Sequence, residues 1–308
     1  MSLGAAIPRH AASPETIGLV APAVVSLAER PDLDRPLGLE RVWPEFVTHG
    51  DVTNLYWDRL YEELPEFQLV LVDDESGEVL GRGNTIPFEW DGTISGLPAG
   101  VDGVLDRAFE AGGTPNTLSA LVAIVAPEHQ GKNLSAVVIE GMRAAAAQHG
   151  LGSLLAPVRP TQKELYPLTA MEHYAAWRRP DGLPFDPWIR LHERIGGEIL
   201  GVAHDSLVVT GSVSEWEEWA GMAFPATGDY VVPGLSCPCT SIVRQTKDDM
   251  ESRTSGCGTT SSRREASPLR GMPGLPRRGI LASRLVRSRI VSRPGFARVP
   301  HAAVRVSA

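Results

Sequence analysis

One succession of elements near the middle of the chain restricts the folds that it can adopt. Leu118 to Val125 is apolar on both faces and predicts a buried strand. Ser135 to His149 has its apolar residues at helical spacing and ends at Gly150, and Ser153 to Val158 predicts a further strand. A strand, a helix and a strand in this order favour a sheet that is covered by helices.

A hairpin precedes this unit. Phe67 to Val72 and Val79 to Pro87 predict two strands, which the turn residues Asp73 to Gly77 connect. We therefore predict an α/β (α+β) fold in a single domain, with a mixed, largely antiparallel central sheet flanked by helices on both faces. Three helices are expected outside the central unit, over residues 39–50, over 51–64 with Asp51 as the N-cap, and over 102–113.

Composition and charge exclude several classes of protein. Hydrophobic residues make up 43% and charged residues 21% of the 308 residues, as in ordinary soluble globular proteins. No apolar run approaches the ~20 residues of a membrane span. The first residues show no basic stretch followed by an apolar core, so we predict no signal peptide, a cytoplasmic location and no membrane partner. Residues 1–235 are strongly acidic, which argues against nucleic acid as a partner.

The segment between the buried strand and the long helix is Gln130-Gly131-Lys132-Asn133-Leu134-Ser135. A helix N-terminus presents unpaired N–H groups and the positive end of the helix dipole, so a tight turn into it can bind an anion. The segment has neither the GK[ST] ending of a Walker loop nor the G-x-G-x-x-G spacing of a dinucleotide fingerprint. Taken alone, it is consistent with a plain turn and with a phosphate-binding loop.

The pattern V-x-P-E-x-Q-G-K-x-L, between a strand and a helix and downstream of a hairpin, resembles the GNAT superfamily of acyl-CoA-dependent N-acetyltransferases. In that family the loop carries Arg or Gln, two residues, Gly or Ala, one residue, and again Gly or Ala. Gln130 matches the first position, whereas Asn133 and Ser135 stand where Gly or Ala is expected. Asn tolerates left-handed backbone better than most residues and Ser is small, so the turn can form with Asn133 and Ser135 at these positions.

No metal-ligand spacing appears in residues 1–235, so we predict no metal. The resemblance implies an acyltransferase that moves an acetyl or similar acyl group from acetyl-CoA or another acyl-CoA to a small-molecule primary amine by direct attack. It implies that backbone groups of Ile124 and Val125 pair with the pantetheine amides, and that an N–H group near Val125 stabilises the oxyanion. A homodimer is compatible with it. The alternative is a non-catalytic acyl-CoA-binding or interaction protein on the same fold. The N–H groups that would hold the pyrophosphate belong to Gln130, Gly131, Lys132, Asn133, Leu134 and Ser135.

Two residues are predicted to carry the proton transfers. The resemblance implies a Tyr acid for the departing thiolate after the strand 153–158; Tyr166 is the nearest candidate and Tyr174 the second. A base is needed to deprotonate the amine, and Glu128 directly follows the strand 118–125. Each of these residues also fits a packing or solvated role. Other candidates for the base are His129, Glu89 and Asp91. The segment His192 to Arg194 is predicted to form a strand edge.

The composition changes abruptly at Ser236. Residues 236–308 hold 14 of the 29 Lys and Arg residues, four of the 37 Asp and Glu residues, and all three cysteines. We interpret this segment as a basic, low-order tail produced by out-of-frame translation; a genuine basic tail and a cysteine site are the alternatives. The interpretation predicts that the body lacks its last strand. The predicted boundaries are a partly helical N-terminal extension (1–36), a GNAT-like domain (37–235) and this tail (236–308).

Overall fold

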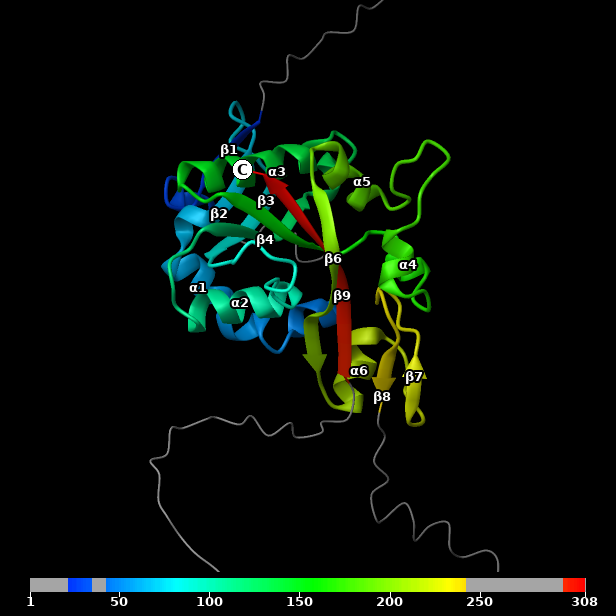
Figure 1. Ribbon diagram of the computed structural model, residues 1–308. Coiled ribbons are helices and arrows are strands. Elements are labelled where there is room, and N and C mark those ends of the chain that lie inside the picture. The colour runs from blue at the N-terminus through cyan, green and yellow to red at the C-terminus, as the bar shows by residue number, and fades with distance from the viewer. Residues whose placement is uncertain (1–21, 35–42, 242–295, 308) are drawn as a thin grey trace, which may run out of the picture.

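The computed structural model describes residues 22–34, 43–241 and 296–307. Its centre is a nine-stranded sheet in the order β1-β2-β3-β4-β5-β9-β8-β7, and β6 also pairs with β9 (Figure 1). Every strand pair is antiparallel except β4 with β5, so the predicted mixed, largely antiparallel sheet is confirmed. The strands are β1 (Ala23–Ser26), β2 (Gln68–Val72), β3 (Val79–Phe88), β4 (Thr117–Val125), β5 (Ser153–Val158), β6 (Glu198–Thr210), β7 (Gly228–Tyr230), β8 (Cys239–Ser241) and β9 (Phe296–Ser307).

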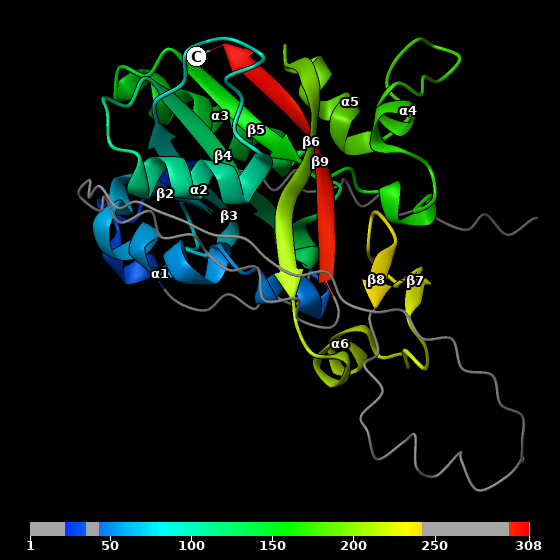
Figure 2. The ribbon, with the colours of Figure 1, turned by 60° about the horizontal axis from the view of Figure 1, so that its bottom comes forward.

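Helices cover both faces of the sheet, as predicted (Figure 2). The helices α3 and α5 pack on one face, and α1 and α2 pack on the other. Neighbouring residues of β5 show this division, because Leu154 lies in the core beneath α3 and Leu155 in the core beneath α2. In the described residues, no helix is long and apolar enough to cross a membrane. The helices are α1 (Thr53–Glu63), α2 (Gly100–Glu110), α3 (Leu134–Gln148), α4 (Met171–Ala175), α5 (Pro187–Arg194) and α6 (Val213–Ala220).

The start of α5 follows from two adjacent residues. The Asp186 carboxylate accepts hydrogen bonds from the backbone N–H groups of Trp188 and Ile189, and Pro187 occupies the first turn. An Asp N-cap followed by Pro satisfies the free donors of a helix start and presets its backbone angle. His192 to Arg194 therefore lie on a helix, and the prediction of a strand edge there is wrong.

The N-terminal region also differs from the prediction. β1 pairs antiparallel with β2, so Ala23–Ser26 belongs to the sheet rather than to a partly helical extension. A 3₁₀ helix at Glu45–His49 stands where a longer helix was expected, and residues 35–42 lie outside the described residues. Asp51 does not cap α1, because its carboxylate accepts hydrogen bonds from the N–H and hydroxyl groups of Thr210 on β6.

The C-terminal segment corrects a further expectation. β9 lies between β5 and β6 in the sheet, and its Val299, Ala302 and Val304 side chains are buried. The sheet therefore has its last strand, and the prediction that the body lacks it is wrong. Residues 242–295, the remainder of the predicted tail beyond β8, lie outside the described residues.

Candidate active site

β4 and β5 are paired at one end and separate toward the other. Their parallel register contains the pairs Leu118↔Leu154 and Ser119↔Leu155, although β4 continues to Val125. Toward β3, the register of β4 shifts so that Leu121 has no partner, as in a β-bulge. The separation leaves a pocket between α3 and α5. Its lining consists of Ala120, Leu121, Val122, Ala123, Ile139, Met142, Leu154, Ala156, Pro157, Val158, Trp188, His192 and Val306.

The backbone of β4 beside this gap offers hydrogen-bonding groups. The Ala126 N–H group donates to the Leu80 oxygen of β3. Because the backbone N–H and C=O groups of successive residues point to opposite sides of a strand, those of Ile124 point toward β3 as well. The backbone groups of Ala123 and Val125 then face the open side, where the Val125 oxygen accepts a hydrogen bond from Gln130 Nε2 at 3.3 Å. The geometry therefore offers Val125 and Ala123 to an extended ligand, whereas the backbone of Ile124 is used in the β3–β4 ladder.

The predicted phosphate-binding loop contains two residues in left-handed backbone conformation. Gly131 has a φ of +79° and Asn133 a φ of +61°, and Asn133 is the one non-glycine residue with positive φ among the described residues. Within that part of the chain, the N–H groups of Gly131 to Ser135 have no acceptor. These donors lie at the N-terminus of α3, whose dipole adds positive potential. A Cβ atom placed on Gly131 would meet no atom within 4 Å.

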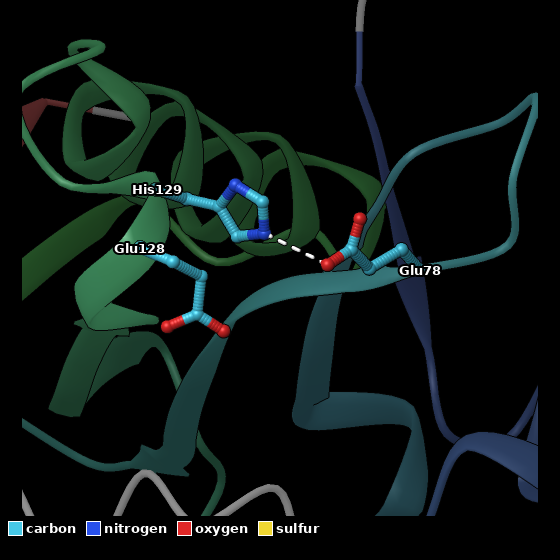
Figure 3. A group of neighbouring side chains, drawn as sticks. All are labelled: Glu78, Glu128 and His129. Atoms are coloured by element: carbon cyan, nitrogen blue, oxygen red, sulfur yellow. Dashed lines mark hydrogen bonds and ion pairs between the residues drawn. The ribbon is translucent and has the colours of Figure 1, made fainter.

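Glu128, the predicted base, lies just before this loop in the chain, in a group with His129 and Glu78 (Figure 3). It is exposed and stands beside His129 and Glu78, with one ligand atom of each within 4.8 Å of the others. The His129 ring is already engaged, because its Nε2 atom lies 3.0 Å from the Glu78 carboxylate and its Nδ1 atom 3.4 Å from Lys132 Nζ. Glu128 does not line the pocket between β4 and β5.

The two predicted Tyr residues lie together in an aromatic cluster. The half-buried ring of Tyr166 packs edge-on against Trp177, at 4.9 Å between ring centroids. Tyr174 is fully buried and its hydroxyl donates to Asp186 Oδ2 at 2.9 Å; burial, with Asp186 beside it, raises the pKa of Tyr174. This contact ties Tyr174 to the residue that caps α5. Neither Tyr side chain lines the pocket.

His192 on α5 does line the pocket, and the sequence analysis assigned it no role. Its side chain is 3% exposed, and its Nδ1 atom lies 2.9 Å from the Trp188 oxygen. Because a carbonyl oxygen can only accept, Nδ1 carries the proton and Nε2 keeps its lone pair. Burial lowers the pKa of His192, so the ring is neutral at neutral pH. The Asp-Pro pair at 186–187 and the four-residue spacing of Trp188 and His192 are the sequence signals that could have revealed this residue.

A second hollow lies on the opposite face of the same gap, beneath α2. It shares Ala156 and Pro157 with the first pocket. The gap between β4 and β5 therefore has a hollow on each face of the sheet. One lies beside α3 and α5, and the other lies beneath α2. Its remaining lining residues are Leu97, Pro98, Gly100, Val104, Ser119, Leu155, Ala203, Ala303 and Val304.

Comparison with known proteins identifies relatives of the chain. No family model matches it. The chain is 31% identical over 242 residues to the arginine N-acetyltransferase avaD of Aspergillus versicolor, and the match covers 70% of this chain and 82% of the relative. It is similar to the solved loading GNATL domain of CurA from Lyngbya majuscula, with 21% identity, 58% of this chain and 85% of that chain covered and a TM-score of 0.45.

A GCN5-related N-acetyltransferase from Kribbella flavida is similar at 14% identity, with 61% of this chain and 88% of that chain covered and a TM-score of 0.32. The identity to the arginine N-acetyltransferase extends over most of that relative's length. The chain belongs to the GNAT superfamily of N-acetyltransferases.

Proposed function

We propose that this protein transfers an acetyl or similar acyl group from acyl-CoA to a primary amine. The observation that carries the proposal is the gap between β4 and β5, with free N–H groups at the start of α3 and with His192 in its wall. The N–H groups of Gly131 to Ser135 suit a pyrophosphate. The open edge of β4 at Ala123 and Val125 suits the pantetheine amides, and the thioester is then proposed to lie in the pocket.

His192 is proposed as the proton-transfer group of the reaction. An amine must lose a proton before it attacks a thioester, and a neutral imidazole with a free Nε2 lone pair can accept that proton directly or through one water. The hydrogen bond from Nδ1 to Trp188 fixes the tautomer that this role needs. Tyr166 and Glu128 remain hypotheses for the acid and the base, and the same assays test them.

The acceptor is proposed to be arginine or a similar cationic amine. The support is the relative, which is named an arginine N-acetyltransferase. The acidic character of residues 1–235 suits a cationic acceptor, because it attracts positive charge.

Two measurements test the proposed function. Calorimetry with acetyl-CoA measures binding, and free-thiol release with a panel of amines measures transfer. We expect saturable acetyl-CoA binding and thiol release that depends on the amine. Binding without release for any amine would support the non-catalytic alternative, and no binding would exclude both.

A further inference from the structure

The pocket between α3 and α5 ends where β4 and β5 are paired. Leu154 lies at this end, in the pair Leu118↔Leu154 of the two strands, and Val306 of β9 lies opposite Leu154 in the β5–β9 register. Residues opposite each other in a sheet share a face, and both side chains line the pocket and are buried. Leu154 and Val306 therefore form the floor of the pocket, over three strands that are paired.

The helix α3 forms the wall beside this floor. Ile139 and Met142 lie three residues apart, on the same side of the helix, and both line the pocket. They are buried and belong to the same core cluster as Leu154 and Val306. Met142 stands two turns after Ser135, about 10 Å along the helix. A ligand that is held by the loop at the start of α3 therefore has to extend along the helix to reach Met142.

The end of the Met142 side chain lies against β3. A Cβ atom built on Gly83 of β3 would stand 2.7 Å from Met142 Cε and 3.0 Å from Val138 Cγ1. Carbon atoms pack at about 3.5–4 Å, so the absence of a side chain at Gly83 leaves the space that Met142 Cε occupies. Met142 thus fills the space between the pocket and β3 and determines how far the pocket extends in that direction.

The pocket is small and apolar. Its volume is about 40 Å³, and a group of the size of a water molecule needs about 10–15 Å³ on the same measure. An acetyl group fits this space, a propionyl group fills it, and a butyryl group exceeds it. Apart from those of Trp188 and His192, the described side chains that line the pocket are apolar, which suits the alkyl end of an acyl group.

We propose that Met142 restricts the acyl donor of this protein to short chains, namely acetyl and propionyl groups. The inference rests on the proposed function, in which the thioester lies in the pocket, and it names the acyl group that the pocket accepts. A longer chain would have to displace Met142 or the floor. Both belong to a close-packed core, in which extra methylene groups force side chains out of their preferred conformations.

The test compares acetyl-, propionyl-, butyryl- and hexanoyl-CoA as donors, with unacylated CoA as the reference for binding. Thiol release is measured with an amine that accepts the acetyl group, and binding is measured by calorimetry. We expect kcat/KM to fall by at least about 10-fold from propionyl-CoA to butyryl-CoA. Hexanoyl-CoA should bind at least about 10-fold more weakly than acetyl-CoA.

The outcomes separate this inference from the proposed function. Equal use or equal binding of acetyl-CoA and hexanoyl-CoA would refute the restriction while upholding acyl transfer. Binding that weakens with chain length, without thiol release from any donor, would uphold the restriction and refute transfer. If neither CoA nor any acyl-CoA binds, both are refuted.

Two variants move the pocket boundary in opposite directions. Met142→Ala removes the side chain beside the floor and should raise the ratio of kcat/KM for butyryl-CoA to that for acetyl-CoA by about 10-fold. Gly83→Ala pushes Met142 away from β3 and should lower the use of propionyl-CoA more than that of acetyl-CoA. Val138→Ala is the matched control, because it shortens a buried side chain of the same helix that does not line the pocket, and it should leave both ratios unchanged.

Each comparison is a ratio of two donors on the same preparation, so a loss of folded protein cancels, and thermal unfolding shows which variants fold. Gly83→Ala tests Met142 even if the cavity in Met142→Ala prevents folding. Donor ratios in the folded variants that equal those of the wild type would remove Met142 from acyl selection.

Discussion

His192 Nδ1 lies 2.9 Å from the backbone oxygen of Trp188, one turn earlier on α5. This bond leaves Nε2 as the atom that can accept a proton in the pocket. Replacing His192 by Gln keeps a side chain of similar polarity that cannot act as a base. We expect kcat to fall by about 10²- to 10⁴-fold while acetyl-CoA affinity changes little. Tyr166→Phe and Glu128→Gln, measured beside it, test the two residues predicted from sequence. A kcat near the wild-type value in His192→Gln would remove His192 from the mechanism.

The pH dependence of the reaction provides an independent check on His192. Burial lowers the pKa of His192 below its usual value of 6.5, so the neutral, reactive form persists as the pH falls through that value. We therefore expect kcat/KM to decline on the acid side only below about pH 6.5. In His192→Gln this decline should vanish from the residual rate. An acid limb centred above 6.5, or one that persists in the variant, would assign the titration to another group.

The left-handed backbone of Asn133 gives a prediction for the loop. Glycine adopts this conformation without strain, whereas a β-branched residue does not. Asn133→Gly should tighten acetyl-CoA binding, and Asn133→Val should weaken it and destabilise the fold by about 1–3 kcal/mol. Gly112→Ala, at another positive-φ position away from the loop, is the control and should lower stability without changing acetyl-CoA affinity. Unchanged acetyl-CoA affinity in both Asn133 variants would indicate a plain turn.

Local patterns predicted the elements that continuous stretches of sequence define. The strand 118–125, the helix after it and the hairpin can each be predicted from the hydrophobic periodicity of one continuous stretch of sequence. β1 carries little pattern of its own, because its place in the sheet comes from pairing with β2 far along the chain. β9 was missed for a related reason, since its partners β5 and β6 lie far before it and the Arg-rich composition around it suggested a tail.

The turn at the start of α3 could be predicted from the sequence, whereas the side chains that line the candidate pocket could not. A polar, glycine-containing turn before a helix indicates an anion loop from sequence alone. The position of His192 depends instead on how α5 packs over the gap between β4 and β5, which is a tertiary relationship. Glu128 illustrates the converse, because this carboxylate follows the predicted strand and yet is exposed beside His129 and Glu78 (Figure 3), outside the lining of the pocket.

Asp102 on α2 predicts an unusual pH dependence of stability. Its Oδ2 atom accepts a hydrogen bond from the Val208 N–H group, its Oδ1 atom has no partner among the described residues, and burial raises its pKa to about 7. Between pH 4 and 7 the folded state therefore binds a proton that the unfolded state has lost, so this group's contribution to stability falls as the pH rises. Asp102→Asn keeps an acceptor for Val208 and cannot ionise. We expect its stability relative to wild type to increase between pH 5 and pH 8 in thermal unfolding. A difference that is independent of pH would contradict the raised pKa.

The pairing of Thr240 with Phe296 joins β8 to β9 as antiparallel neighbours across residues 242–295. A Gly- and Asn-containing loop of about five residues can therefore connect Ser241 to Phe296. Shortening the connection roughly tenfold lowers the entropy cost of loop closure, and we expect a gain of about 2 kcal/mol in the free energy of unfolding. Ending the chain at Ser241 should instead prevent folding, because β6 loses the strand with which it pairs and β5 keeps only its short pairing with β4. Chemical denaturation of the two variants beside the full chain tests both outcomes. A stable protein after truncation at Ser241 would show that β9 is dispensable, and resequencing the coding DNA tests separately whether the intervening segment is read out of frame.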